Sequence, residues 1–232
     1  MRQIIAMGGG GFSMEPTNPL LDEYILNQSQ SAKPKICFLP TASGDAQGYI
    51  DRFYESFEKF VCEPTHLSLF SLPKVGPEEL LLAQDIIYVG GGNTKSMLAV
   101  WTEWGLDVIL RNAWEQGTIL TGLSAGSICW FEEGLTDSYG EALQPLKCLG
   151  FLPGSHSPHY DSEETRRPIF HHLIASGAMM GGFGADDGAG LHFIDDKLFT
   201  VVSSRPNAKG YSVKMIDGKL VEQEIDTRYL GE

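Results

Sequence analysis

The first two-thirds of the chain alternate short apolar runs with stretches of helical periodicity. The runs end at glycine or proline, which is typical of parallel strands buried on both faces. We predict such strands at residues 4–7, 36–39, 86–89 and 118–121. Between them, apolar residues recur at the helical period. They are Leu20, Leu21, Tyr24 and Ile25, then Ile50, Phe53, Phe57 and Phe60, and then Met97, Leu98 and Trp101. The alternation predicts an α/β fold with a mostly parallel sheet and helices on both faces.

The pattern changes at about Gly188. Four further runs have strand character, and the turn sequences Asp195-Asp196 and Asp217-Gly218 lie between them. These predicted strands are residues 191–194, 199–203, 211–216 and 220–225. We interpret them as an antiparallel C-terminal extension of the same sheet, so that residues 1–232 form a single domain.

Composition and charge narrow the class of protein. Hydrophobic residues make up 42% of the chain and charged residues 20%, which is ordinary for a globular domain. The net charge of −13 makes a nucleic-acid partner unexpected, because phosphate binding requires clustered Lys and Arg. No apolar run has the length of a membrane span, and the first one is too short for the core of a signal peptide. We therefore expect a cytoplasmic protein without a membrane partner. The four cysteines lack CxxC spacing, which disfavours a zinc knuckle or a redox motif.

The strand predicted at residues 118–121 leads into Gly-Leu-Ser-Ala-Gly, with the serine at position 124. A strand, a G-x-S-x-G turn and a helix form a nucleophile elbow, which raises the serine hydroxyl above the sheet edge. The N–H of Ala125 would then lie at a helix N-terminus, where it can donate to a developing oxyanion. The alternative is an ordinary turn in which Ser124 caps the helix.

A nucleophilic serine needs a base, and His159 is our candidate. It lies at a predicted strand end, in Ser-Pro-His-Tyr, 35 residues after Ser124. His156 and His159 have H-x-x-H spacing, but Pro158 between them argues against a helical metal site, and we expect no metal. We interpret His156 as a solvated loop residue or a substrate contact. His66 and His192 are expected in packing or surface roles, and His171 and His172 on a helix surface.

The orienting acid should follow another strand end, and Asp186 and Asp187 come after the apolar run at residues 179–183. A carboxylate there would hold the imidazole in one tautomer. The alternative is a turn with solvated aspartates. Four other polar residues compete for the role. They are Glu132, Glu133, Asp137 and Asn207.

Two glycine runs follow predicted strands. Residues 90–92 are glycines followed by Asn93, and their N–H groups can approach a ligand closely, which makes the run a candidate second oxyanion donor. It lacks the Gly-Lys-Ser/Thr of a phosphate-binding Walker motif. Residues 8–11 are also glycines and hint at a dinucleotide-binding oxidoreductase. Ser13 breaks that fingerprint, however, and Pro16 and Pro19 crowd the helix start.

Four of these motifs together resemble the peptidase E (aspartyl dipeptidase) family of serine peptidases, to which the cyanophycinases are related. They are Val-Gly-Gly-Gly-Asn-Thr at 89–94, Gly-Leu-Ser-Ala-Gly-Ser at 122–127, Pro-His-Tyr at 158–160 and Glu-Thr-Arg at 164–166. The resemblance extends from the first strand to about residue 215. It implies a flavodoxin-like, doubly wound sheet similar to that of class I glutamine amidotransferases. Those enzymes carry cysteine at the elbow, so Ser124 disfavours a glutaminase.

The resemblance also implies roles for individual residues. Ser124 would be the nucleophile and His159 the base, with Gly92 and Ala125 as oxyanion donors. Asp187 resembles the position at which the family places a glutamate as third member, with Asp186 or Asn207 as alternatives. Arg166 resembles the arginine that reads the aspartate side chain of the substrate, and Asn93 is a further predicted substrate contact.

We therefore predict a cofactor-independent serine peptidase acting on small peptides, with Asp-X dipeptides as the implied substrates. The alternative is a non-catalytic or repurposed protein that keeps the fold with a weakened triad. A general α/β-hydrolase esterase also uses G-x-S-x-G, but it expects a late histidine and an HGGG-type loop that this chain lacks.

Overall fold

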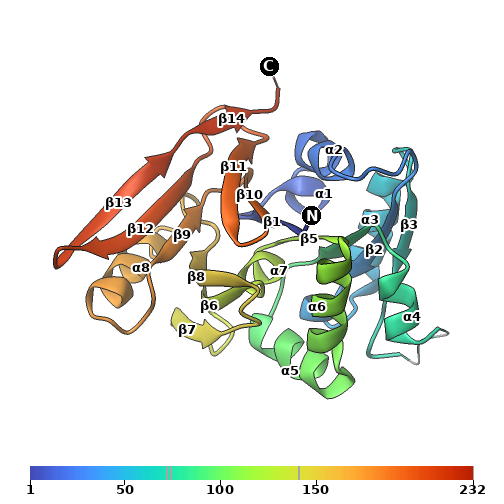
Figure 1. Cartoon of the computed structure of the whole chain (residues 1–232), viewed down its shortest axis with the longest axis horizontal. Coiled ribbons are helices and arrows are strands. Elements are labelled where there is room, and N and C mark those ends of the chain that lie inside the picture. Colours follow the sequence, from blue (N-terminus) through green and yellow to red (C-terminus); the bar gives the residue numbers. More distant parts are fainter. Residues whose placement is uncertain (72, 74, 141, 232) are drawn as a thin grey trace.

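The computed structural model describes residues 1–71, 73, 75–140 and 142–231. Within these ranges the protein has two β-sheets with helices packed against them (Figure 1). The larger sheet has eight strands in the order β14-β11-β10-β1-β5-β4-β2-β3. In chain order they are β1 (Gln3–Met7), β2 (Lys35–Leu39), β3 (Glu63–His66), β4 (Ile86–Val89), β5 (Ile119–Leu123), β10 (Ala189–Ile194), β11 (Lys197–Ser203) and β14 (Thr227–Tyr229).

The four strands predicted in the first two-thirds of the chain are confirmed as β1, β2, β4 and β5. Together with β3 they form the parallel part of the eight-stranded sheet. Every residue of β4 and β5 is buried. Helices cover both faces of a parallel sheet, which is why these strands can be apolar throughout.

Helices pack on both faces of the eight-stranded sheet, as the alternation predicts. Neighbouring residues of β4 point to opposite faces: Tyr88 joins one hydrophobic core and Val89 the other. The first core includes residues of three helices, α1 (Gly11–Met14), α2 (Leu20–Leu26) and α3 (Gln47–Phe57). The second includes residues of four helices, α4 (Pro77–Leu82), α5 (Thr94–Trp104), α6 (Leu106–Gln116) and α7 (Ala125–Ile128). A short 3₁₀ turn, η1 (Thr41–Ser43), follows β2.

The C-terminal strands divide between two sheets. β10 pairs antiparallel with β1 and with β11, so the predicted extension of the first sheet is confirmed for these two strands. The strands predicted at 211–216 and 220–225 do not join it. They are β12 (Gly210–Ile216) and β13 (Lys219–Ile225), which form a hairpin in the second sheet. The expectation of one continuous sheet is therefore wrong for this hairpin.

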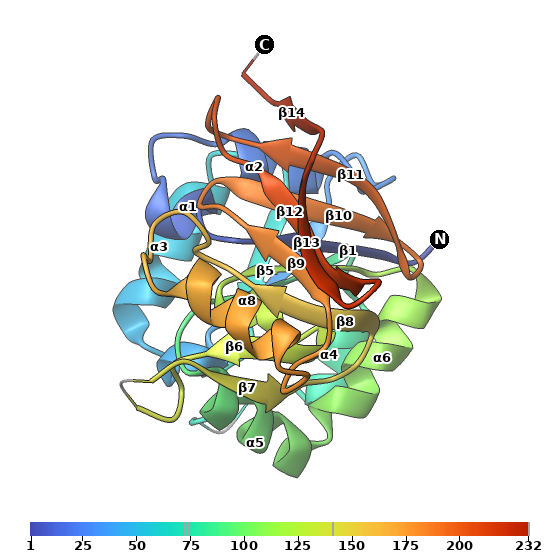
Figure 2. The same ribbon diagram turned by 90° about the vertical axis from the view of Figure 1, so that its left-hand side faces the viewer.

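The second sheet has six strands in the order β13-β12-β9-β8-β6-β7. Its remaining members are β6 (Phe131–Thr136), β7 (Gln144–Lys147), β8 (Leu152–Ser157) and β9 (Gly182–Ala185). Phe131 and Phe183 pack against Phe193 of the first sheet. The helix α8 (Arg166–Ala175) covers the other face, where Phe170 joins a separate core, and Figure 2 shows it in front of these strands.

The loops that follow β1, β4 and β5 lie at one edge of the parallel sheet, where open α/β sheets bind their ligands. The loop after β8 and the turn between β9 and β10 reach the same edge, since His159 and Asp187 there contact the loop after β1. Among the helices that the structure describes, none has both the length and the apolar character needed to cross a bilayer.

Candidate active site

Ser124 follows β5 directly and precedes α7, as the elbow motif predicts. Its backbone has φ 54° and ψ −116°, a conformation that non-glycine residues rarely adopt. The turn is tight because Gly126 lies against β4. A Cβ added to Gly126 would lie 2.2 Å from the Val89 carbonyl oxygen, so no larger residue fits without a shift. Strain of this kind is concentrated at functional sites.

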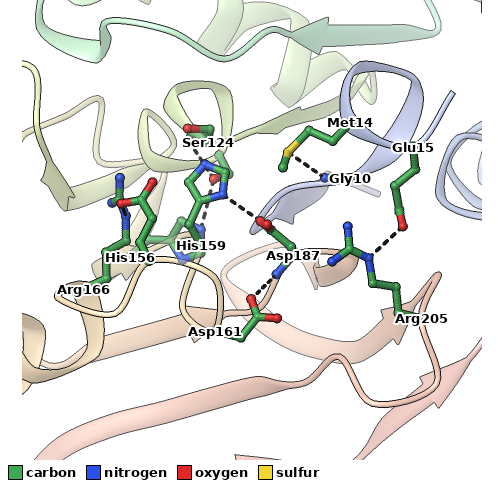
Figure 3. Close-up of polar contacts among 12 residues, drawn as sticks. Gly10, Met14, Glu15, Ser124, His156, His159, Asp161, Arg166, Asp187 and Arg205 are labelled. Carbon is green, nitrogen blue, oxygen red and sulfur yellow. Dashed lines mark hydrogen bonds and ion pairs between the residues drawn. The ribbon is translucent and has the colours of Figure 1, made fainter.

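His159 lies just beyond β8, and its backbone also has a positive φ, 53°. Its N–H donates to the Gly8 carbonyl oxygen in the loop after β1, over 3.3 Å. Its ring donates from Nδ1 to Oδ1 of Asp187, over 2.7 Å. The ring lies between Ser124 and Asp187 (Figure 3). Because Nδ1 carries the proton in this bond, Nε2 is left as the basic nitrogen.

Asp187 lies in the turn that leads from β9 in the second sheet to β10 in the first. Its side chain is 6% exposed, and its N–H donates to Oδ1 of Asp161 over 2.8 Å. Burial opposes ionisation of Asp187, but the hydrogen bond from His159, together with that from Ser162 and the charge of Arg205, outweighs it and holds the carboxyl pKa below its ordinary value. The carboxylate is therefore ionised at neutral pH and suited to orient an imidazole.

The glycine run after β1 gives Asp187 its place. Gly9 forms a bridge with Asp187, and a Cβ added to Gly9 would lie 2.1 Å from Oδ1 of that carboxylate. The residues of this run that hinted at nucleotide binding thus make room for the Asp187 carboxylate. The four glycines at a strand end already signalled a close backbone approach, although not its partner.

The two alternatives for the acid lie elsewhere. Asp186 points toward β12, where its Oδ2 accepts the N–H of Lys209 over 2.9 Å and the hydroxyl of Tyr211 over 3.3 Å. Burial raises the pKa of Asp186 to about 6. Asn207 is exposed. Of the three candidates, Asp187 is the one that contacts His159.

The glycine loop after β4 adjoins Ser124. A Cβ added to Gly91 would lie 3.4 Å from Cβ of Ser124. Gly92 is exposed and has φ 139°, a backbone conformation that favours glycine. Asn93 has both of its side-chain groups bonded: Oδ1 accepts the Ser96 N–H over 2.8 Å and caps α5, while Nδ2 donates to the Ser138 carbonyl over 3.2 Å.

These observations place a strained serine, an imidazole and a carboxylate together at one sheet edge. Residues 4–201 match the model of peptidase family S51. This chain belongs to peptidase family S51. It is 58% identical over 231 residues to the uncharacterized peptidase YgaJ of Bacillus subtilis (strain 168), and the match covers 100% of both chains. It is therefore a serine-type peptidase with the predicted peptidase E-like character.

Two solved structures share the fold of this peptidase. A peptidase from an acI-B1 actinobacterium superposes with a TM-score of 0.70 at 18% identity, covering 98% of this chain and 95% of that one. A candidate peptidase E from Listeria monocytogenes EGD-e superposes with a TM-score of 0.57 at 15% identity, covering 97% of this chain and 100% of that one. The α/β fold class predicted from the sequence is thereby confirmed.

Arg166 begins α8 and is almost fully buried in this peptidase. Its Nε donates to Oε2 of Glu163 over 2.6 Å, and its Nη1 donates to the Leu135 carbonyl over 3.0 Å. The guanidinium is thus already paired with one carboxylate. Figure 3 shows it on the side of His156 that faces away from Asp187.

The interpretation of His156 as a solvated loop residue or a substrate contact is wrong. It belongs to β8, its side chain is fully buried, and its ring stacks on Phe131 with 4.8 Å between centroids. Burial lowers the pKa of His156 to about 3, so the ring is neutral. His171 and His172 lie on α8 as expected: His172 is exposed, and His171 is half-buried and bonds Oε2 of Glu222 over 2.7 Å. In the described part of the chain, no three His, Cys, Asp or Glu side chains are grouped so that they could hold a metal ion.

Proposed function

We propose that this peptidase cleaves short peptides through Ser124, His159 and Asp187. The observation that carries the proposal is the 2.7 Å bond from His159 Nδ1 to Asp187, on a ring that lies beside the strained serine. The bond selects the tautomer in which Nε2 can take a proton. A serine hydroxyl needs such a base to act as a nucleophile.

The reaction proceeds in two steps. Oγ of Ser124 attacks the scissile carbonyl carbon, and its proton passes to Nε2 of His159. The tetrahedral intermediate then collapses, its C–N bond breaks, and His159 returns the proton to the departing amine. A water molecule next attacks the acyl-enzyme with His159 again as base, which frees the acid product and restores Ser124.

Two backbone N–H groups are proposed to hold the oxyanion. Ala125 is the first residue of α7, and the first N–H groups of a helix have no partner within it. Gly92 belongs to the glycine loop after β4. The residue before it in that loop, Gly91, lies against Ser124. Donors arranged before the reaction stabilise the charge that develops on the carbonyl oxygen, and losing one typically costs about 10²–10³ in kcat.

The proposed substrates are peptides with an N-terminal aspartate, read by Arg166. A buried guanidinium can bind a carboxylate with parallel hydrogen bonds. Glu163 already holds one edge of Arg166 and is itself 44% exposed, so a substrate carboxylate must approach the free edge or displace Glu163. Asn93 is a less direct candidate, because both of its polar groups are bonded within the chain.

The chain also carries four cysteines that form no disulfide: Cys37, Cys62, Cys129 and Cys148. Unpaired buried cysteines are typical of reducing compartments. This supports the proposal that the peptidase acts in the cytoplasm.

One experiment tests the catalytic proposal. Wild type and Ser124→Ala are treated with a fluorophosphonate and assayed on dipeptides that vary in the first residue. We expect labelling of Ser124 alone and a loss of kcat on the order of 10⁶ in the variant. A wild type that takes no label would favour the non-catalytic alternative, and full activity in Ser124→Ala would exclude this serine as the nucleophile.

A second experiment tests the specificity. Arg166→Met should lower kcat/KM on Asp-X dipeptides at least tenfold, which is about 1.4 kcal/mol, because the substrate carboxylate loses its cation. Hydrolysis of a p-nitrophenyl ester without a carboxylate is the control and should hardly change. If wild type cleaves no Asp-X dipeptide, the specificity is wrong while the serine-peptidase chemistry stands.

A further inference from the structure

The carbonyl oxygen of Ser124 is held from three directions. It accepts the N–H groups of Ser127 and Ile128, both over 2.9 Å, and the hydroxyl of Ser127 over 2.8 Å. Ser127 is fully buried beneath the nucleophile. The Ser127 hydroxyl thus bonds the main chain of the residue that carries the reactive oxygen.

This carbonyl belongs to the same peptide unit as the proposed oxyanion donor. The peptide group is planar and trans, so the C=O of Ser124 and the N–H of Ala125 point in opposite directions. Whatever fixes the carbonyl therefore also aims the N–H. The positive φ of Ser124 is unfavourable for a serine, and such a conformation persists only where the surroundings hold it.

The second sheet supports Ser127 from the other side. Nε2 of His156 lies 3.1 Å from Oγ of Ser127, and Nδ1 lies 3.1 Å from the Phe183 carbonyl oxygen. A carbonyl only accepts, so Nδ1 carries the proton of the neutral ring and Nε2 is an acceptor. The Ser127 hydroxyl has a single proton, which therefore lies between two acceptors, Ser124 O at 2.8 Å and His156 Nε2 at 3.1 Å, with the shorter bond to Ser124. The stack of His156 on Phe131 leaves the ring little freedom to turn away.

We propose that Ser127 is a positioning residue for acyl transfer, which aims the Ala125 N–H at the oxyanion by holding the Ser124 carbonyl, and that His156 fixes the place of Ser127. The proposal rests on the proposed function of Ser124 and deepens it. It assigns a role to the last residue of the motif Gly-Leu-Ser-Ala-Gly-Ser. It also explains why a neutral, fully buried histidine lies three residues from the base without contacting Asp187.

A simpler explanation is that Ser127 only stabilises the turn, since serine hydroxyls often bond a carbonyl one turn earlier in a helix. A matched variant separates the two. Ser155 is also fully buried, and its hydroxyl donates to the Met180 carbonyl over 2.6 Å, on β8 and away from the elbow. Ser127→Ala and Ser155→Ala therefore remove the same kind of buried bond, and only the first touches the elbow.

The test measures the rate of fluorophosphonate labelling, the hydrolysis of p-nitrophenyl acetate and the melting temperature. Ser127→Ala should slow labelling and lower kcat about tenfold with KM nearly unchanged, because a misaimed donor loses part of an oxyanion contact. Ser155→Ala should lower the melting temperature at least as much with wild-type rates. Ser127→Thr keeps the hydroxyl and should restore the labelling rate.

The outcomes are distinguishable. If Ser127→Ala labels at the wild-type rate, or if Ser155→Ala slows labelling equally, the positioning role is wrong and the proposed function stands. If Ser127→Ala does not fold, His156→Gln replaces it, and a melting transition shows that this second variant is folded. Slow labelling of folded His156→Gln supports the positioning role, and labelling at the wild-type rate overturns it. If wild-type Ser124 takes no label at all, the proposed function fails and this inference fails with it.

Discussion

The two sheets contribute different parts of the candidate active site. The eight-stranded sheet provides Ser124 after β5 and the glycine loops after β1 and β4. The six-stranded sheet provides His159 after β8. Asp187 belongs to neither alone, because it lies where the chain crosses from β9 in one sheet to β10 in the other. Ser124 and His159, the proposed nucleophile and base, are therefore aligned only as well as the two sheets are packed together.

The two sheets also differ in how they are built. The inner parallel strands β4 and β5 are buried along their length, and β5 leads directly into the elbow. The strands of the six-stranded sheet mix buried, half-buried and exposed residues, and β7 and β13 contain no buried residue. We infer that the first sheet holds the elbow in place. Contacts across the junction between the two sheets, where Asp187 lies, then set the relative positions of Ser124, His159 and Asp187.

The largest expected effect is at the junction itself. Asp187→Asn removes the charge that stabilises the imidazolium and allows the amide to favour the wrong tautomer of His159. We expect kcat to fall by about 10⁴, as for loss of a triad aspartate elsewhere, with little change in KM. Steady-state assays on the best dipeptide from the panel measure this.

Asp186→Asn is the matched control for that variant. It changes the adjacent carboxylate, which bonds the Lys209 N–H and the Tyr211 hydroxyl in the second sheet and does not contact His159. We expect kcat to stay within a few-fold of wild type. Equal losses in the two variants would contradict the assignment of Asp187 as the acid.

A smaller effect is expected at Gly9, which lies in the loop after β1 and contacts Asp187 at the junction. Gly9→Ala places a Cβ 2.1 Å from the present position of Asp187 Oδ1, so the carboxylate must move. A displacement of about 1 Å typically costs on the order of 10² in rate, and we expect kcat to fall by about that factor. Fluorophosphonate labelling should slow in parallel, because His159 then lacks its orienting partner.

Gly48→Ala is the control for Gly9→Ala. Gly48 lies in α3, and the nearest atom to an added Cβ is the end of the Arg52 side chain, 4.0 Å away. This substitution should leave kcat unchanged and raise stability slightly, since alanine is the better helix former. Wild-type activity in Gly9→Ala would show that Asp187 tolerates movement and that the junction is less constrained than we infer.

The same difference between the sheets explains what could be predicted from the sequence. Buried parallel strands carry a strong apolar signal, so β1, β2, β4 and β5 and the elbow between β5 and α7 could be predicted. In the second sheet, β12 and β13 could also be predicted as strands, but β7 and β9 carry a weak signal: β7 is Gln-Pro-Leu-Lys and β9 is Gly-Phe-Gly-Ala. Their pairing depends on contacts with distant segments, which local pattern does not encode.

The site shows the same limit. Ser124, His159 and the pair Asp186 and Asp187 could be singled out as candidates because each follows a strand end. The choice between the two aspartates depends on which one points toward His159, and adjacent residues in an extended chain face opposite ways. The burial of His156 could not be foreseen, because its strand contains proline and glycine and has no apolar run.

The smallest effect on activity is expected at Asp22, a buried acid in the helix α2, which packs on the first sheet. Asp22 in α2 is 2% exposed, and burial raises its pKa to about 7, with the charges of Glu15 and Glu23 acting in the same direction. The folded state therefore holds this proton up to a higher pH than the unfolded chain, where the ordinary value is 3.8. The stabilisation that protonated Asp22 gives is complete below about pH 4 and is lost as the pH rises through 7.

Asp22→Asn should remove that dependence, because the amide has the same shape and no proton to lose. Urea unfolding of both proteins should show that the variant gains on the order of 2 kcal/mol over wild type between pH 5 and pH 8. Contributions from His156 and His192, whose pKa values burial lowers, cancel in this difference because both proteins share them. The variant should keep wild-type kcat, since Asp22 lies in the hydrophobic core of α1 and α2 and contacts no residue of the proposed triad. A loss of kcat with unchanged stability would instead mean that the far face of the first sheet reaches the active site, and the division of labour between the two sheets would be wrong.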